Sequence, residues 1–195
     1  MAFIGPLVLS GTHVLLEPIE PAHHDALVTA ATDGALWKLW YTSVPPPDQM
    51  AAYINAALKM RRDLGALPFV IRDRRDDRIV GSTRFFNVEA AHRRLEIGHT
   101  WHAASAQRSA INTEAKLLLL THAFEHLNCI AVEMRTHFMN HASRAAIARL
   151  GAKQDGILRN NAITADGSYR DTVVFSIIES EWPAVKRHLQ FKLDR

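Results

Sequence analysis

Residues 107–113 read Gln-Arg-Ser-Ala-Ile-Asn-Thr and lie between a predicted β-strand, residues 95–102, and a strongly apolar predicted helix, residues 114–127. Small residues before a helix leave backbone N–H groups uncovered, and the helix dipole adds partial positive charge at the same place. This junction therefore predicts a seat for a phosphate-bearing ligand. A plain structural turn stays the alternative, because many strand–helix turns contain small residues and bind nothing.

The composition indicates one soluble domain. The chain has 195 residues, of which 48% are hydrophobic, enough for a full core. Its one cysteine, Cys129, excludes an intramolecular disulfide, and neither an 18-residue apolar run nor a basic-then-apolar N-terminal segment occurs. We therefore expect a single domain over residues 1–195, a cytoplasmic location and no membrane partner. The net charge of +3 is mild and spread out, which tolerates an anionic cofactor but does not indicate nucleic-acid binding.

Upstream of the junction, apolar spacing and turn residues predict two helices followed by a hairpin. Asp48 is expected to cap the second helix and Gly65 to end it. A polar turn over residues 73–78 joins the two hairpin strands. The elements predicted here are a strand over residues 8–18 with a bend at Gly11, helices over 21–32 and 48–64, and strands over 67–72 and 79–88.

Downstream of the junction, the pattern predicts a strand, a short helix, a second hairpin and a closing helix. The second hairpin turns at Ala165, Asp166 and Gly167. The order is that of a mixed α/β domain, antiparallel at both ends, with one strand–helix–strand crossover in the middle. The predicted ranges are strand 130–136, helix 143–150, strands 154–161 and 169–178, and helix 181–193.

Several spaced motifs agree with one family. They are Leu-Glu-Ile-Gly at residues 95–98, the loop 107–112, Asn-Thr-Glu-Ala-Lys at 112–116, an Asn-x-x-Ser-x-x-Ala-Ile-x-x-Leu-Gly-Ala run at 140–152, and Gly-x-x-Arg-Asp at 167–171. The chain thereby resembles the GNAT superfamily of acyl-CoA N-acyltransferases, and most closely the Rim-type branch that acetylates ribosomal-protein N-termini. The resemblance implies an α/β (α+β) GNAT fold: a mixed, mostly antiparallel seven-stranded sheet with helices on both faces. It also makes a homodimer plausible.

The resemblance implies that acetyl-CoA binds where the fourth and fifth strands diverge. In the family, a loop of pattern Gln/Arg-x-x-Gly-x-Gly/Ala cradles the pyrophosphate, and the matching positions here are Gln107, Ala110 and Asn112. Ala110 resists positive φ, whereas Asn112 tolerates it and could cap the helix. The expected cofactor-binding residues are Thr100, Trp101, His102, Gln107, Arg108, Ser109, Ala110, Ile111, Asn112, Thr113 and Asn140.

The transfer needs a neutral amine, a donor for the oxyanion and a proton source for sulfur. By the resemblance, a backbone N–H within residues 100–102 faces the thioester oxygen, Asn140 bonds the pantetheine arm or orders water, and Ser143 lies near the sulfur. Many GNAT enzymes place a tyrosine acid seven residues after that asparagine. Ile147 occupies the position here, so Ser143 or a bound water would have to protonate the sulfur.

Glu96 is the first candidate for the base, acting through one or two waters. In a regular strand it shares a face with Thr100 and His102. The alternative is an edge carboxylate paired with an arginine such as Arg94. His99 and His102 also remain candidates, because histidine titrates near neutrality.

A second group of polar residues, Tyr169, Arg170 and Asp171, lies at the hairpin that overhangs the acceptor mouth in the family. We expect Arg170 and Asp171 to form a structural pair rather than to contact substrate.

The acceptor amine is constrained by its pKa. At pH 7 a free α-amine is about 10–15% neutral, whereas about one lysine in 2,500 is neutral. A site without a strong base therefore favours a peptide N-terminus or a small-molecule amine over lysine. The sequence does not separate a protein N-terminus from an amino acid, a polyamine or an antibiotic.

Two other functions compete with this hypothesis. His122, Glu125 and His126 fit the H-x-x-E-H pattern of inverted zinc metallopeptidases, but no further ligand signature follows, so we expect no metal. The altered loop and the missing tyrosine also allow a non-catalytic acyl-CoA-binding module.

Overall fold

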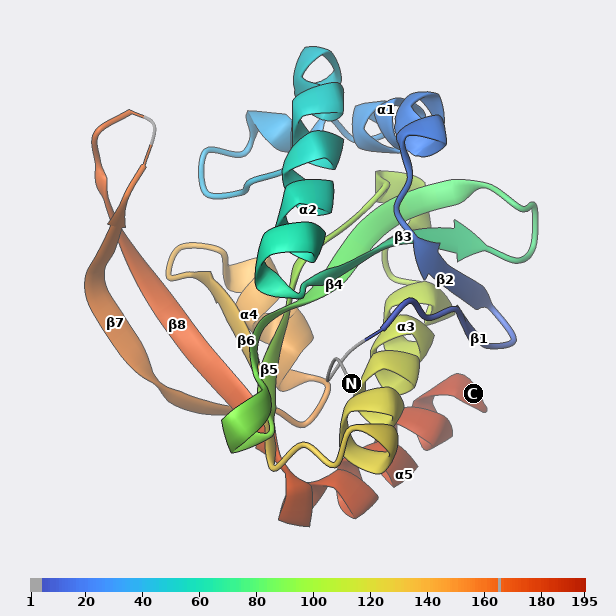
Figure 1. Cartoon of the computed structure of the whole chain (residues 1–195), viewed down its shortest axis with the longest axis vertical. Helices are drawn as coiled ribbons and strands as arrows, with labels where there is room; N and C mark the ends of the chain where they lie inside the picture. Colours follow the sequence, from blue (N-terminus) through green and yellow to red (C-terminus); the bar gives the residue numbers. More distant parts are fainter. Residues whose placement is uncertain (1–4, 165) are drawn as a thin grey trace.

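An eight-stranded sheet in the order β1-β2-β3-β4-β5-β6-β8-β7 organises the computed structural model, which describes residues 5–164 and 166–195 (Figure 1). Every neighbouring pair is antiparallel except β5 and β6. Ala165 of the predicted second turn lies outside the described residues. The strands are β1 (Leu9–Ser10), β2 (Val14–Pro18), β3 (Leu67–Asp73), β4 (Ile79–Glu89), β5 (Arg94–His102), β6 (Ala131–His137), β7 (Lys153–Ile163) and β8 (Tyr169–Ile178).

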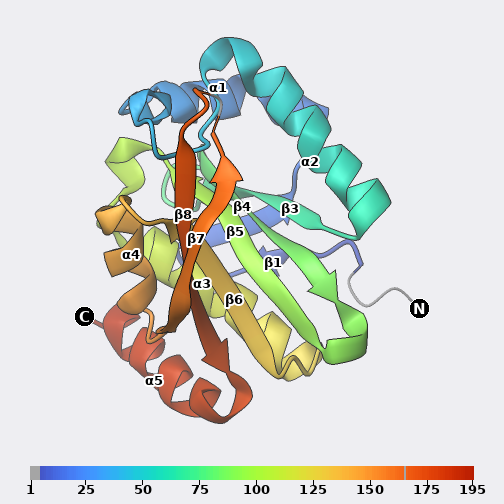
Figure 2. The ribbon, with the colours of Figure 1, turned by 90° about the vertical axis from the view of Figure 1, so that its left-hand side faces the viewer.

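The helices cover both faces of the sheet. On β5, Trp101 donates its indole N–H to Tyr53 of α2, and the next residue back, Thr100, bonds Lys116 of α3. Because neighbouring strand residues point to opposite faces, α2 and α3 lie on opposite sides (Figures 1 and 2). The helices are α1 (His24–Thr32), α2 (Met50–Leu64), α3 (Ala110–Thr121), α4 (His141–Ala148) and α5 (Trp182–Leu193).

The prediction of seven strands is wrong by one, because the strand expected over residues 8–18 is divided into β1 and β2. The division follows from Glu114, whose buried carboxylate accepts the amides of Thr12 (2.8 Å), His13 (2.6 Å) and Val14 (2.7 Å). Those bonds hold the chain in a turn at the predicted bend, Gly11, where a β-carbon would overlap the carboxyl group.

Helix α3 begins four residues before the predicted start at 114. Ser109 is the N-cap, since its Oγ accepts the amide of Ile111 (3.4 Å). The expected cap, Asn112, lies inside the first turn instead. At its far end α3 passes into a π-helical segment, His122–His126. In α2 the predicted cap Asp48 makes no capping bond, whereas Gly65 ends the helix with φ +65° as expected.

The parallel contact between β5 and β6 is short. Three residue pairs form it, and Glu96 with Glu133 is the last. Beyond them the two strands diverge, which confirms the expected gap between the predicted fourth and fifth strands. Among the described residues, none pairs as a strand with the edge of β5 from Ile97 onward on that side.

Strand β5 also contains a bulge. His99 has φ +48°, and the register with β4 shifts there, so that Arg84 pairs with Gly98 and Ser82 with Trp101. One extra residue reverses the alternation of side chains. The prediction that Glu96 shares a face with Thr100 and His102 is therefore wrong: Thr100 bonds Lys116 on the α3 side, whereas Glu96 bonds Asn87 and lines a pocket with residues of α2.

Candidate active site

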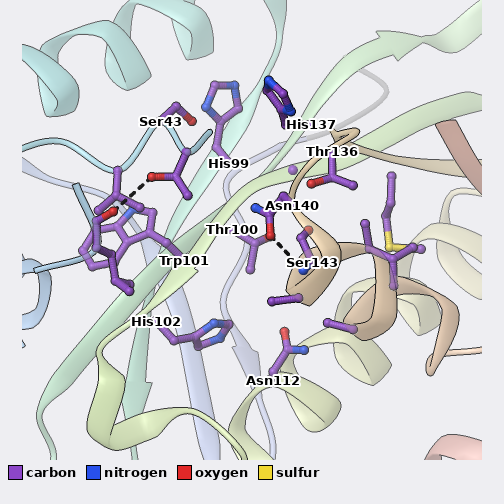
Figure 3. A pocket seen from close by; sticks show the side chains of 18 of the residues that line it. Ser43, His99, Thr100, Trp101, His102, Asn112, Thr136, His137, Asn140 and Ser143 are labelled. Carbon is purple, nitrogen blue, oxygen red and sulfur yellow. Dashed lines mark hydrogen bonds between the residues drawn. The ribbon is translucent and has the colours of Figure 1, made fainter. Parts of the chain in front are cut away.

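A cavity of about 810 Å³ lies in the gap between β5 and β6. Its walls are residues 97–102 of β5, residues 134–137 of β6, the loop before α3 and the inner side of α4. In Figure 3, His99, His137 and Ser43 lie at one end, His102 and Asn112 at the other, and Thr100, Asn140 and Ser143 between them. The gap is thus a continuous space that reaches from the start of α3 to the hairpin β7–β8.

The start of α3 is open to this cavity. Gln107, Arg108, Ser109 and Asn112 line it. Arg108 has φ +57°, so the left-handed residue of the loop is Arg108 and not Ala110 or Asn112. The amides of Arg108, Ser109 and Ala110 make no hydrogen bond within the described chain. Free amides at a helix N-terminus are the arrangement that binds phosphate.

Three of the expected cofactor-binding residues, Ala110, Ile111 and Thr113, do not line the cavity. The side chains of Ile111 and Thr113 are buried in the core, 2% and 3% exposed. The amide of Ile111 is already bonded to Ser109 Oγ. The free amides identified here are therefore those of Arg108 and Ser109, just before α3, and of Ala110, its first residue.

Residues Thr100, Trp101 and His102 form the β5 wall of the cavity. Burial and the nearby charge of Lys116 lower the pKa of His102 to about 3, and its Nε2 is buried without a partner. The indole N–H of Trp101 is bonded to Tyr53 Oη (3.3 Å). A histidine held neutral in this way does not act as a base at neutral pH.

Lys116 is a site residue that the sequence reasoning did not single out. Its side chain is 5% exposed, lines the cavity and donates from Nζ to Oγ1 of Thr100 (2.7 Å) and of Thr83 (3.4 Å). No carboxylate lies within 4.0 Å of Nζ in the described chain. Burial lowers its pKa to about 7. A lysine on the polar side of an apolar helix is common in sequences, so the pattern gave no signal. Lys116 becomes a site residue because the bulge in β5 brings Thr100 next to it.

The opposite wall comes from the start of α4. Asn140 is its N-cap, with Oδ1 accepting the amide of Ser143 (3.0 Å), and both residues line the cavity (Figure 3). The cap occupies the oxygen of Asn140 and leaves its amide nitrogen without a partner in the described chain. Ile147, one turn further, adds an apolar wall. The structure thus brings Asn140 and Ser143 across the gap from Thr100.

Glu96 does not line this cavity. It is 4% exposed and lines a separate pocket of about 330 Å³. Asn87 donates to Oε2 (2.9 Å), Arg135 Nε lies 3.4 Å away, and burial raises the pKa of the carboxyl group. The expected partner Arg94 pairs with Glu133 instead. Gly98 lines the cavity, and a β-carbon on it would lie 2.7 Å from the ring of Phe86 and 3.6 Å from Oε1 of Glu96.

The far end of the cavity carries His99, His137 and Arg170. Desolvation, with the charges of Arg84 and Arg170, lowers the pKa of His99 to about 4. The expected pair of Arg170 with Asp171 is wrong, because Asp171 bonds Arg159 Nε (2.5 Å) and the amide of Asn160. Arg170 and Asp171 are neighbours in β8 and point to opposite faces.

The zinc pattern finds no support as a site. Glu125 accepts from Trp182 Nε1 (2.8 Å) and Lys186 Nζ (2.7 Å), which directs it to α5. The rings of His122 and His126 stack with centroids 5.3 Å apart. In residues 5–164 and 166–195, no three histidine, cysteine or acidic side chains gather as a metal site would require.

Comparison with known proteins agrees with this geometry. The model of the acetyltransferase (GNAT) domain matches residues 13–153. The Bacillus subtilis protein named "Putative ribosomal N-acetyltransferase YdaF" is 31% identical over 111 residues, which are 57% of this chain and 60% of the relative. A GCN5-related N-acetyltransferase from Brucella melitensis is 28% identical, with a TM-score of 0.86 over 97% of this chain and 86% of the other.

A more distant structure shares the fold. The microcin C7 self-immunity acetyltransferase MccE, in complex with acetyl-CoA and AMP, is 18% identical, with a TM-score of 0.74 over 86% of this chain and 93% of that one. The chain belongs to the GNAT acetyltransferase family, as its motifs suggested. The name of the Bacillus relative agrees with the expected likeness to the Rim-type branch. No helix within the described residues has the length and apolar character needed to cross a membrane.

Proposed function

We propose that this protein is an N-acetyltransferase that moves an acetyl group from acetyl-CoA to a primary amine by direct attack. The observation that carries the proposal is a single cavity that joins the free amides at the start of α3 to Asn140 and Ser143 across the gap between β5 and β6. Family membership supports the same chemistry.

The chain has groups that suit CoA at the expected place. Free amides of Arg108, Ser109 and Ala110 and the guanidinium of Arg108 offer a seat for the pyrophosphate. Acetyl-CoA supplies the acetyl thioester. Unpaired backbone along the β5 edge and the free amide nitrogen of Asn140 offer donors for its polar groups. The cavity, about 810 Å³, lies within the range of small-molecule sites.

The reaction needs two proton transfers, one away from the attacking amine and one to the departing sulfur. Glu96, with its raised pKa, accepts the amine proton through one or two waters near Gly98, which lines the cavity and packs against the ring of Phe86. Ser143 or a water beside it protonates the departing sulfur, because Ile147 provides no acid. Lys116 holds Thr100, and with it the bulged edge of β5, in position.

The acceptor is a peptide N-terminus or another α-amine, because the pKa of an α-amine is lower than that of lysine and more of it is neutral at pH 7. We also propose a homodimer, on family grounds. Light scattering of the purified protein tests the oligomeric state, and a monomer across the micromolar range would refute it.

Thioester turnover tests the function. Purified protein is incubated with acetyl-CoA and a panel of dipeptide amides, amino acids and polyamines, with release of CoA and the mass of each product recorded. We expect acetylation of at least one α-amine at a rate that depends on Asn140. CoA binding by calorimetry without turnover of any amine would instead support a non-catalytic acyl-CoA-binding module.

A further inference from the structure

Most of the basic groups that line the cavity have no counter-charge among the described residues. Among the described residues that form its wall are four arginines and a lysine and no aspartate or glutamate. Arg108 lies at the phosphate end and Lys116 beneath β5, and Arg135 is paired with Glu133. Arg149 and Arg170 are the other two arginines of the wall and have no ion pair among the described residues, and Arg170 lies at the far end.

Arg170 has no ion pair within the described chain. Its Nε is buried and makes no hydrogen bond. Asp171 is bonded to Arg159, and Glu96, whose charge acts on Arg170, is held by Asn87 and Arg135 outside the cavity. A half-buried guanidinium that lines a cavity and lacks an anion is costly unless a ligand supplies one.

Arg84 places a second guanidinium behind the wall of the cavity, where its Nη1 donates to Sδ of Met60 on α2 (3.2 Å). It is 2% exposed, lies 5.2 Å from the ring centroid of Tyr53, and leaves Nε and Nη2 without partners. The charges of Arg84 and Arg170 both act on His99. Tyr53 and His99 line the cavity, so the positive potential of Arg84 reaches it through its wall.

We propose that the acceptor carries a carboxylate close to its primary amine, and that Arg170 with His99 and His137 forms the subsite for that carboxylate. The inference rests on the proposed function and names its substrate class. The carboxylate supplies the anion that Arg170 lacks, within the positive field to which Arg84 adds. The same positive field disfavours an ammonium ion, so it favours the neutral amine that attacks. Polyamines and aminoglycosides, which are polycations, are excluded as good acceptors by charge.

Isosteric acceptor pairs test the subsite. The probes are Ala-Glu-amide against Ala-Gln-amide, and free glutamine against glutamine α-amide, with spermidine as the polycation. For the acidic member of at least one pair we expect kcat/KM about tenfold or more above that of its neutral isostere, and a smaller ratio at high salt. Which pair shows the preference distinguishes a peptide from an amino acid. A ratio of one or below in both pairs, or spermidine as the best acceptor, would overturn the proposal.

Variants assign the preference to Arg170. In Arg170→Met the acid-to-neutral ratio should fall to about one, while Arg170→Lys, which keeps the charge, should retain part of it. Arg187→Met on the exposed side of α5 removes the same charge outside the cavity and should leave the ratio unchanged. An unchanged ratio in Arg170→Met would refute the assignment.

Binding of products separates this inference from the function itself. Calorimetry with CoA-loaded protein compares N-acetyl-Ala-Glu-amide with N-acetyl-Ala-Gln-amide, and N-acetylglutamine with N-acetylglutamine α-amide. Tighter binding of an acidic product, lost in Arg170→Met, would support the subsite even if no amine were acetylated. Acetylation of amines without any acidic preference would keep the function and remove the subsite.

Discussion

The amine nitrogen of Lys116 lies 2.7 Å from Oγ1 of Thr100, the residue that follows the bulge at His99. This bond ties the second turn of α3 to the strand edge that faces the gap. The same helix begins with the free amides of the phosphate seat. The two ends of the proposed thioester site are therefore fixed to one helix, at the cost of a buried amine.

Replacing Lys116 with methionine should raise the free energy of unfolding most at pH 7 and below. Burial lowers the pKa from its ordinary 10.5 to about 7, so between these values the unfolded chain binds the proton and the folded chain does not. The free energy of unfolding of the native protein therefore rises with pH across that window. Below it, the free-energy cost of burying the charged Lys116 amine is fully present. The hydrogen bond to Thr100 that the variant loses reduces the gain in stability by about 1 kcal/mol.

Urea unfolding at pH 7 and pH 9.5 checks this. The increase in the free energy of unfolding that Lys116→Met causes should be smaller at the higher pH. The substitution Lys59→Met, at an exposed lysine, should show no such trend. A gain equal at both values would contradict the expected titration.

Ala110→Glu should weaken CoA binding by about 30-fold or more, because a carboxylate at the first helical residue repels phosphate. Acidic residues in the first helical turn stabilise a helix, so the fold should persist. Calorimetry with CoA measures the effect. Ala110→Gln has nearly the same shape and should lose much less affinity; equal losses in the two variants would point to bulk and not to charge.

Asn140 should reveal two separate roles. Asn140→Ala removes the cap of α4, at about 1 kcal/mol, and the free amide nitrogen in the cavity. Asn140→Asp keeps an oxygen for the cap but loses the nitrogen. We expect lower turnover in both variants and lower stability in the alanine variant alone. Thermal unfolding and steady-state kinetics measure the two effects, and unchanged kinetics would remove Asn140 from the site.

Glu96→Gln should lower kcat by about a hundredfold with the KM for acetyl-CoA unchanged. Burial raises the pKa of Glu96, and the carboxylate is the form that accepts a proton, so native activity should rise as the pH increases through that raised pKa. The glutamine variant should lack this limb of the pH–rate profile. A variant that retained the limb would assign the base to another group.

Gly11→Ala should destabilise the protein by about 1–3 kcal/mol, because the added methyl group meets the buried Glu114 carboxyl. Glu114→Ala alone should also destabilise it, since three amides lose their acceptor. In the double variant the two costs should be less than additive in chemical denaturation. Strict additivity would mean that the two residues do not share one contact.

Most of the fold followed from local patterns that the chain carries in short segments. Apolar periodicity and turn residues located β3, β4, β5 and β8 within about two residues, which is the ordinary error of element boundaries. Gly11 predicted a bend, but the full division of this segment into β1 and β2 could not be predicted, because its cause is Glu114, about a hundred residues away. The start of α3 was missed because two residues, Ser109 and Asn112, could each serve as the cap.

The candidate site was predictable where a motif fixed a backbone position. The loop at 107–109 and the pair Asn140 and Ser143 lie on one cavity, as their motifs suggested. The side-chain directions of β5 were not predictable, because a single left-handed residue, His99, reverses the alternation. That reversal is what takes Glu96 away from Thr100 and brings Lys116 to it.

The three residue pairs that join β5 to β6 leave the sheet nearly divided at its centre. A thioester lying in the gap would take the place of a missing strand and would connect two halves that otherwise share few main-chain bonds. Its binding should therefore slow amide hydrogen exchange in both β5 and β6 beyond Glu96 and Glu133, so that the substrate serves as an internal brace of the molecule that consumes it.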